Sequence, residues 1–305
     1  MTDNVLPKFS LFVVVSLGLC GPAKSMSLSE QFAHYRETHP IFHRMVAGHD
    51  WSYIVSGSGA QTVVILPGGG GCDPECMFPV VAALEPQCRV IEIGYAPTAT
   101  TVQDLIEGVR AILDNCGVEH CCLLGHSLGG FVERAFVQAY PQRVEALIIA
   151  NSTVYTPGRA LLIKAILPIS FVLPRSVMLS VVRSKFSSLL KTLPEADREF
   201  WMGYVDQSEM VKPGSQSLRN QAHCMLDFIR HGWDKPVAVP GWNGRVLIIE
   251  SSEETGFTLK ERQILRAHYP GATVHIIQGA GHGSFMTHPQ EFNETVTGFL
   301  AEKKS

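Results

Sequence analysis

The sequence has few charged residues and no concentration of positive charge. Charged residues make up 17% of the 305 residues, and the formal net charge is −3. Binding to nucleic-acid phosphates needs clustered lysine and arginine side chains, and no basic cluster of that type occurs. We therefore expect no nucleic-acid partner. Hydrophobic residues make up 46%, which is typical of a globular, rather apolar chain and not of a disordered one.

The N-terminal apolar run is too short to span a bilayer comfortably, because a span takes about 20 apolar residues. It covers residues 9–20, within an N-terminal extension of residues 1–25, and small residues around Ala23 follow it. This pattern resembles a secretory signal or a short membrane anchor. Met26 opens a stretch that is equally suited to begin a soluble protein, so residues 1–25 are alternatively an extension or a start-site artefact.

The eight cysteines include no Cys-x-x-Cys pair. The close pair Cys72 and Cys76 lacks the second pair of cysteines or histidines that a zinc site needs. Cys121 and Cys122 lie in an apolar run, where free cysteine behaves as a small hydrophobic residue. Reduced cysteines favour a cytoplasmic protein, whereas the N-terminal apolar run favours a secreted or membrane-anchored one.

No spacing of residues indicates a metal ion or a cofactor. The four histidines His34, His39, His43 and His49 lack regular spacing and carboxylate partners, so we interpret them as surface residues. The glycines at 68–71 are not followed by the Gly-Lys-Ser/Thr of a phosphate-binding loop. We therefore expect no metal and no cofactor.

Short apolar runs alternate with helical patterns through most of the chain. We predict strands at residues 62–66, 89–95, 121–125, 144–152, 245–251 and 273–279, and helices at residues 101–117, 131–142, 259–270 and 289–303. Strands that are apolar on both faces and alternate with helices indicate an α/β fold, with a parallel sheet covered on both sides. Ligand sites in such sheets lie beyond the carboxyl ends of the strands.

Residues 153–240 interrupt this alternation and have a helical pattern with proline breaks. We predict a helical cap here, inserted into a core made of residues 26–152 and 241–305. Between Tyr155 and Pro194 the cap has six basic residues and no acidic one. One interpretation is a lid packed on the core with its basic side chains in water. The other is a cationic, apolar surface that meets lipid or an anionic substrate.

The sequence GHSLG, residues 125–129, follows one of the predicted strands and opens a helical pattern. It matches the Gly-x-Ser-x-Gly motif in the context where that motif places a serine on a tight turn between a strand and a helix. The glycines allow neighbouring elements to pass closely, and the Ser127 hydroxyl then projects beyond the sheet near a helix N-terminus. Ser127 is therefore the candidate nucleophile.

A serine hydroxyl needs a base to become an effective nucleophile. His282 follows the last predicted strand, at the same edge of the sheet, and is the candidate base. The loop after the preceding strand supplies the acid that orients such a base. Glu250 is expected to lie still within the strand, so Glu254 is the preferred acid and Glu253 the reserve.

These motifs resemble those of the α/β-hydrolase fold superfamily, from about Phe42 to the end of the chain. The motifs are GHSLGG, GAGH followed by Pro289, and the acid-bearing loop between them; the order Ser, acid, His is also that of the superfamily. The resemblance implies a mostly parallel central sheet with helices on both faces, and a helical cap inserted after strand 6.

The resemblance also implies an oxyanion hole, but two positions depart from the family pattern. Pro67 and Gly68 stand where the family carries His-Gly, so the expected donors are the backbone N–H groups of Gly69 and Leu128. The acid is a glutamate where aspartate is usual, and some members use glutamate in the same role.

Within the superfamily, three stretches resemble the maspardin-like group: YRETHPIFHRMVAG, LIIANSTVY and RAHYPGA. Maspardin is understood as a binding protein with a degenerate catalytic set. This chain departs from maspardin by keeping His126 before Ser127 and a full GAGH, which favours an active enzyme.

The leading functional prediction is a serine hydrolase that cleaves an ester or another acyl-type bond through a Ser-His-Glu triad and an acyl-enzyme. The expected partner is a hydrophobic small-molecule acyl substrate, and membrane contact through residues 9–20 or the cap is an open alternative. The oligomeric state is left open. Alternative functions are a non-catalytic partner-binding protein on the same fold, an acyltransferase, or a hydrolase of carbon–carbon bonds, which the fold alone does not separate.

Overall fold

The computed structural model describes residues 26–69, 73–208, 211–212, 216–233, 239 and 241–302. The predictions for residues 1–25, including the apolar run of residues 9–20, and for Cys72 lie outside these described residues. Among them, no helix is both long enough and apolar enough to cross a membrane.

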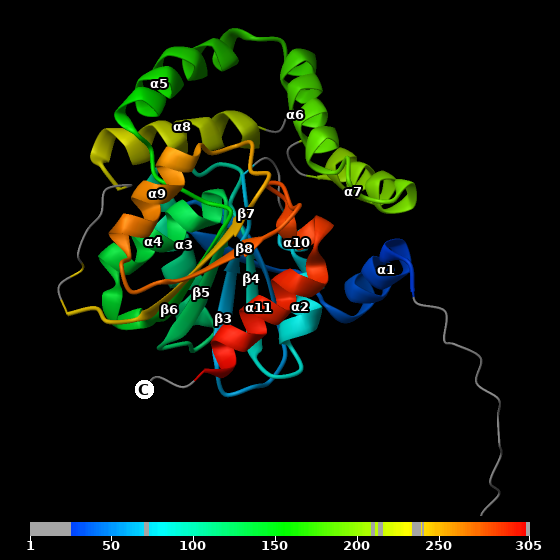
Figure 1. Cartoon of the computed structure of the whole chain (residues 1–305), viewed down its shortest axis with the longest axis vertical. Coiled ribbons are helices and arrows are strands. Elements are labelled where there is room, and N and C mark those ends of the chain that lie inside the picture. Colours follow the sequence, from blue (N-terminus) through cyan, green and yellow to red (C-terminus); the bar gives the residue numbers. More distant parts are fainter. Residues whose placement is uncertain are drawn as a thin grey trace, which may run out of the picture.

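An eight-stranded sheet forms the centre of the molecule, in the order β1-β2-β4-β3-β5-β6-β7-β8 (Figure 1). The strands are β1 (Phe42–Val46), β2 (His49–Ser56), β3 (Thr62–Leu66), β4 (Arg89–Gly94), β5 (Cys121–His126), β6 (Val144–Ala150), β7 (Arg245–Ser251) and β8 (Thr273–Ile277). From β4 to β8 all neighbours are parallel, whereas β1 and β2 form an antiparallel hairpin on the edge. The predicted mostly parallel sheet is confirmed, and the hairpin is an addition that the strand patterns did not predict.

Helices cover both faces of this sheet, as predicted. The helices outside the cap are α1 (Leu28–Thr38), α2 (Phe78–Leu84), α3 (Val102–Asn115), α4 (Leu128–Ala139), α9 (Leu259–His268), α10 (Ser284–Thr287) and α11 (Pro289–Ala301). One hydrophobic cluster joins the sheet to α3, α4 and α9, and a second joins it to α1, α2, α10 and α11. Each face of the sheet therefore has its own core.

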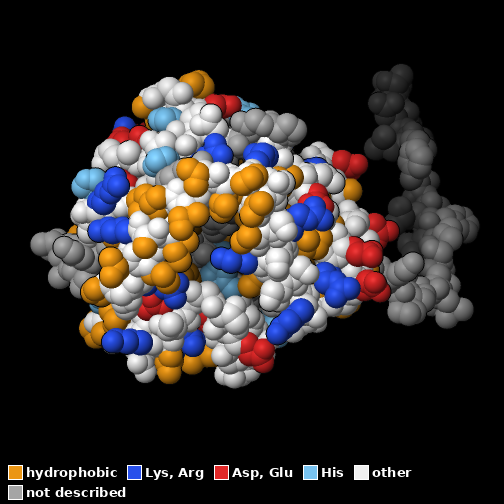
Figure 2. Space-filling view, turned by 90° about the horizontal axis from the view of Figure 1, so that it is seen from above, with side chains coloured by type: hydrophobic (Ala, Val, Ile, Leu, Met, Phe, Trp, Pro, Cys, Tyr) orange, Lys and Arg blue, Asp and Glu red, His pale blue; other side chains and the backbone are white. Residues whose placement is uncertain are grey.

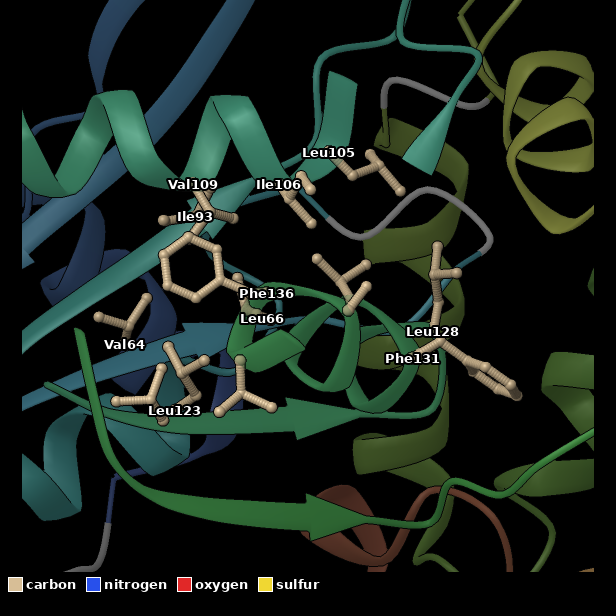
Figure 3. Packing of buried hydrophobic residues seen from close by; sticks show 14 of the residues in the cluster. Val64, Leu66, Ile93, Leu105, Ile106, Val109, Leu123, Leu128, Phe131 and Phe136 are labelled. Atoms are coloured by element: carbon tan, nitrogen blue, oxygen red, sulfur yellow. The ribbon is translucent and has the colours of Figure 1, made fainter. Parts of the chain in front are cut away.

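Helices α3 and α4 pack on the sheet through apolar residues that recur at helical spacing. The start of α3 is fixed by a capping box, in which the Thr101 hydroxyl accepts from the Asp104 N–H and the Asp104 carboxylate accepts from the Thr101 N–H. Such a box satisfies two of the backbone donors that a helix start leaves without partners. Figure 3 shows Val109 of α3 and Phe136 of α4 beside Leu66 of the sheet. This packing fixes the position of α4, which carries the serine motif at its N-terminus.

The described residues between β6 and β7, where the cap was predicted, form four helices. They are α5 (Pro157–Val172), α6 (Arg175–Leu189), α7 (Glu195–Gln207) and α8 (Ser217–His231), and Figure 1 shows them above one edge of the sheet. Helix α8 is fixed to the core because Asp227 accepts from the Val102 N–H at 2.8 Å and Asn220 donates to the Pro97 carbonyl at 2.8 Å. Seen from the cap side, the molecule has a central hollow surrounded by hydrophobic and basic side chains (Figure 2).

Helix α7 is fixed to the core by aromatic packing. Trp201 is fully buried, and its ring lies 5.8 Å from that of Phe78 in α2, centroid to centroid. Tyr204 meets Phe32 of α1 edge-on at 5.6 Å. Offset and edge-on contacts of this kind add to the area that the rings bury. The cap thus has two anchored helices, α7 and α8.

A buried carboxyl lies beneath α1. Glu92 of β4 is 1% exposed, and one of its oxygens accepts from the Met77 N–H at 2.8 Å. The Tyr35 hydroxyl lies 3.4 Å from the other oxygen. Burial raises the pKa of Glu92 to about 8, against an ordinary value of about 4.3. The side chain is therefore protonated at neutral pH in the folded protein.

Glu92→Gln should flatten the pH dependence of stability. The folded state keeps the Glu92 proton up to about pH 8, whereas the unfolded state releases it near its ordinary pKa. The contribution of this group to the free energy of unfolding is therefore complete at low pH and declines as the pH rises through that interval. Glutamine cannot ionise, so the melting temperature of the variant should fall less than that of the wild type between about pH 5 and about pH 8. An equal fall in both proteins would contradict the buried, protonated state.

Candidate active site

Ser127 lies on a strained turn between β5 and α4. Strand β5 pairs with β6 through His126 and Ala150, and the Ser127 N–H then donates to the Ala150 carbonyl at 2.9 Å. Ser127 has φ 51° and ψ −108°, and α4 begins at the next residue. A positive φ is uncommon for a residue with a side chain and is often found at functional sites. The turn holds the hydroxyl at the carboxyl edge of the parallel strands.

Three glycines make this turn sterically feasible. A Cβ on Gly129 would lie 1.9 Å from the Leu66 carbonyl oxygen, and one on Gly130 would lie 2.4 Å from the Ser152 Cβ. A Cβ on Gly125 would lie 2.5 Å from the backbone of Gly129. Helix α4 therefore crosses β3 and the end of β6 at distances that only glycine allows.

The structure brings Ser127, His282 and Glu254 into one hydrogen-bonded line. The Ser127 Oγ and the His282 Nε2 are 2.9 Å apart, and the His282 Nδ1 and the Glu254 Oε2 are also 2.9 Å apart. The three residues follow β5, β8 and β7 respectively. Because these strands are parallel, the loops at their carboxyl ends meet at one edge of the sheet.

Backbone hydrogen bonds join the acid loop to the histidine loop. The Glu253 N–H donates to the Ala280 carbonyl at 2.9 Å, and the Ser252 N–H donates to the Ile277 carbonyl at 3.1 Å. The Ser252 hydroxyl accepts from the Gly279 N–H at 2.8 Å, where the backbone has φ 73°. The distance between Glu254 and His282 is thus set by backbone contacts as well as by the side chains.

Glu254 is held ionised by its neighbours despite its burial. Its side chain is 1% exposed. Burial alone would raise the pKa of this carboxyl, but hydrogen bonds from His282, the Gly256 N–H and the Asn151 amide outweigh burial and lower the pKa. The Gly256 N–H donates to Oε1 at 2.6 Å, and the Asn151 Nδ2 donates to Oε2 at 3.2 Å. A carboxylate in this state can orient a histidine and stabilise its positive charge.

The other two glutamates of this loop region lie elsewhere. Glu250, as expected, is still within β7, where it is buried and binds Arg262 and Arg266. Glu253, the reserve candidate, is exposed. The geometry therefore favours Glu254 as the partner of His282.

His126 forms a hydrogen bond to the backbone of the histidine loop. Its Nε2 lies 2.9 Å from the His282 carbonyl oxygen, and since a carbonyl only accepts, this nitrogen carries the proton. Burial, together with the nearby His282, lowers the pKa of His126 to about 3. The ring is therefore neutral, and its hydrogen bond fixes the backbone of His282.

Gly69 and Leu128, the two residues expected to supply the oxyanion donors, lie beside each other. A Cβ on Gly69 would lie 3.4 Å from the Leu128 Cδ2 and 3.2 Å from the Gln221 Oε1 of α8. Leu128 is the first residue of α4, so its N–H has no acceptor within the helix. The Tyr95 hydroxyl donates to the Pro67 carbonyl at 3.0 Å and so fixes the start of the glycine loop.

Three residues of the site were not singled out from the sequence. Asn151 binds the acid and has φ 43°, a backbone region that asparagine tolerates better than most residues. Gln221 reaches the glycine loop from the cap, and the Phe257 ring lies edge-on to His282 at 5.2 Å. Asn151 carries a usable signal because it directly follows a parallel strand at the ligand-binding edge.

The described residues contain no group of three or more side chains that could hold a metal ion. The N-terminal histidines instead pair singly with carboxylates. His39 lies 2.7 Å from Glu85, and His43 lies 3.1 Å from Asp50. The interpretation that these histidines lack carboxylate partners is therefore wrong for His39 and His43, because sequence spacing does not show which residues the fold brings together.

With this geometry established, comparison with known proteins identifies the family. The sequence profile described as the alpha/beta hydrolase family matches residues 63–295. The chain belongs to the alpha/beta hydrolase family. The predicted fold superfamily and the predicted class, a hydrolase on this fold, are confirmed. The resemblance to the maspardin-like group stays a prediction.

Individual relatives in this family share about a quarter of their residues with the chain or fewer. The mouse sn-1-specific diacylglycerol lipase ABHD11 is 25% identical over 219 residues, which are 68% of this chain and 67% of that protein. The 2-hydroxy-6-oxononadienedioate/2-hydroxy-6-oxononatrienedioate hydrolase of Paraburkholderia phymatum is 24% identical over 274 residues, 82% of this chain and 90% of that one. The crystal structure of a hydrolase from Pseudomonas aeruginosa superposes with a TM-score of 0.72 at 20% identity, covering 86% of this chain and 98% of that one.

Gly129→Ala should destabilise the protein, because its methyl group would meet the Leu66 carbonyl oxygen at 1.9 Å. Overpacking of this kind typically costs about 1–3 kcal/mol. Gly298→Ala in α11 is the matched control, since its Cβ would meet nothing within 4 Å, and alanine at a helical position gains up to about 1 kcal/mol over glycine. Equilibrium unfolding in urea measures both variants. A Gly129→Ala protein as stable as Gly298→Ala would contradict the close crossing of α4 and β3.

Proposed function

We propose that the protein is a serine hydrolase that cleaves an ester or another acyl-type bond of a hydrophobic small molecule through an acyl-enzyme. The observation that carries this proposal is the hydrogen-bonded line from Ser127 through His282 to Glu254, with 2.9 Å at each step. Nucleophile, base and orienting acid within this reach form the arrangement that activates a serine hydroxyl.

In the first half of the reaction, Ser127 Oγ attacks the carbonyl carbon of the substrate and His282 Nε2 takes its proton. Glu254 accepts from His282 Nδ1–H, which keeps Nε2 available as the base and stabilises the imidazolium that forms. The N–H groups of Gly69 and Leu128 bind the developing oxyanion. Each such donor contributes about 100- to 1000-fold to the rate. His282 then passes the proton to the leaving group, and the acyl group stays on Ser127.

In the second half, a water molecule donates its proton to His282 and attacks the acyl carbon. The tetrahedral intermediate is held by the same two N–H groups. Its collapse returns the proton from His282 to Ser127 and releases the carboxylic acid. His126 contributes indirectly, because its hydrogen bond to the His282 carbonyl keeps the ring in place between serine and acid.

Apolar groups around the serine favour a hydrophobic substrate. The Leu128 side chain lies at the glycine loop and the Phe257 ring contacts His282. Figure 2 shows hydrophobic side chains around the hollow on the cap side. The relatives named as a diacylglycerol lipase and as an oxononadienedioate hydrolase support hydrolysis but leave the substrate open.

Retention of a complete Ser-His-Glu arrangement argues against the non-catalytic alternative. An acyltransferase would use the same acyl-enzyme with an alcohol as acceptor, and a carbon–carbon hydrolase would accept diketones. Product analysis with added alcohols and with diketones separates these two from an ester hydrolase.

Glu254→Gln should lower kcat/KM for a soluble ester by about 1000-fold or more, because loss of the acid's charge in a triad typically costs about 10⁴-fold. Glu253→Gln is the matched control and should keep activity within about threefold, since this exposed side chain is not hydrogen-bonded to His282. Steady-state kinetics on purified variants measures both. A larger loss of kcat/KM in Glu253→Gln than in Glu254→Gln would contradict the assignment of Glu254 and indicate that Glu253 is the acid that orients His282.

Activity on a series of p-nitrophenyl esters should rise with acyl chain length until the apolar site is filled. Each methylene group that becomes buried contributes about 0.8 kcal/mol, which is up to about fourfold in kcat/KM. Ser127→Ala should abolish turnover of every member of the series. Residual activity of this variant near the wild-type level would rule out Ser127 as the nucleophile. Activity that does not change with acyl chain length would rule out the hydrophobic acyl site but not the nucleophile.

A further inference from the structure

Helices α5 and α6 expose an apolar surface that the core does not cover. Neither helix contains a buried residue among its described side chains, whereas α7 and α8 bury aromatic residues on the core. The exposed large hydrophobic residues of α5, here called the outer α5 face, are Leu161, Leu162, Ile166, Ile169 and Val172. Leu161 is 70% exposed and Val172 82%. Val177 and Val181 continue the apolar surface on α6.

Helix α5 has apolar residues on two sides, and only one side faces the protein. Ala160, Ile163 and Leu167 are half-buried and share one side of the helix, while α5 packs against α8. At 3.6 residues per turn, the five residues of the outer α5 face span about 140° on another side. A helix that is apolar on more than its core-facing side is expected to have a second apolar neighbour. In this chain alone, that second side meets solvent.

The charges of the segment that carries the outer α5 face have one sign. Residues 155–194 contain six basic residues and no acidic one. Arg159 and Arg183 pair with Glu261 and Asp206, which lie outside this stretch. Lys164, Lys185 and Lys191 are exposed. The partner of this surface should therefore be apolar in its interior and negatively charged at its boundary.

We propose that the outer α5 face and the exposed lysines of the same segment, Lys164, Lys185 and Lys191, dock onto an anionic lipid bilayer. Apolar side chains of such a helix enter the boundary between headgroups and acyl chains, while lysines stay at the anionic headgroups. A second copy of the chain fits less well, because two such faces would bring like charges together. The cap side also holds the hollow seen in Figure 2, so docking would present the hydrolase site toward the membrane.

Co-sedimentation with vesicles tests this surface directly, using the full chain with Ser127→Ala so that vesicle lipid is not consumed. Binding to vesicles of equimolar phosphatidylglycerol and phosphatidylcholine should exceed binding to pure phosphatidylcholine by about tenfold or more. The difference should shrink as salt is raised, since ions screen exposed charges. No binding to either vesicle, or equal binding that salt leaves unchanged, would overturn the proposal.

Substitutions in different parts of the chain show which residues contact the vesicle. Leu162→Glu combined with Ile166→Glu should weaken binding by about tenfold or more, whereas Met45→Glu, at an exposed residue of β1, should leave it unchanged. Val14→Glu controls for residues 9–20; loss of binding in this variant, with binding kept in the α5 pair, would assign the contact there and overturn the proposal. If the α5 pair unfolds in a thermal melt, Lys164→Glu with Lys185→Glu replaces it and should weaken binding to anionic vesicles only.

A second copy of the chain is the remaining alternative partner of the outer α5 face, and it must be distinguished from lipid. Light scattering without vesicles measures the oligomeric state of the wild type and of the α5 pair. A wild-type dimer that the α5 pair converts to a monomer, with no vesicle binding in either protein, would assign the face to a second copy. Because none of these readouts measures turnover, their failure is independent of whether the protein hydrolyses esters.

Discussion

The site depends on the close crossing of α4 over β3 at the turn that carries Ser127. Gly129 lies where a methyl group would be 1.9 Å from the Leu66 carbonyl oxygen, and Ser127 is held at φ 51°. A strained conformation of this kind persists only where surrounding packing fixes it. The core under α3 and α4 provides that packing, as Figure 3 shows for Leu128 and Phe136. The serine hydroxyl and the helix N-terminus are thereby presented together.

The parallel register of the strands brings the loops that carry Glu254 and His282 to the same edge of the sheet as Ser127. Leu66 pairs with Gly125, and Ala150 pairs with both His126 and Ile249, so the loops after these strands begin at one level. Backbone hydrogen bonds between the acid loop and the histidine loop then limit their separation. The distances between Ser127, His282 and Glu254 therefore follow mainly from the sheet, while the cap contributes the apolar surroundings and, through α5, the proposed membrane contact.

Most of the sheet and the main site residues could be predicted from the sequence because their signals are local. Buried parallel strands are continuous apolar runs, and the serine motif has a fixed relation to strand and helix. Strand β1 gave no such signal, since four of its five residues are exposed. The sequence ranked Glu254 above Glu253, but only contacts in three dimensions separate the two and reveal the hydrogen bond from Asn151, because adjacent residues of a loop point in directions that sequence spacing does not determine.

The most direct measurement of the central claim is the site of covalent modification by a fluorophosphonate, which mimics an acyl substrate and reacts with an activated serine. The labelled protein is digested and the modified peptide is mapped by mass spectrometry. We predict a single adduct on Ser127 that is absent from Ser127→Ala and strongly reduced in His282→Ala. An adduct on another residue, or none on the intact protein, would contradict the proposed hydrolase mechanism.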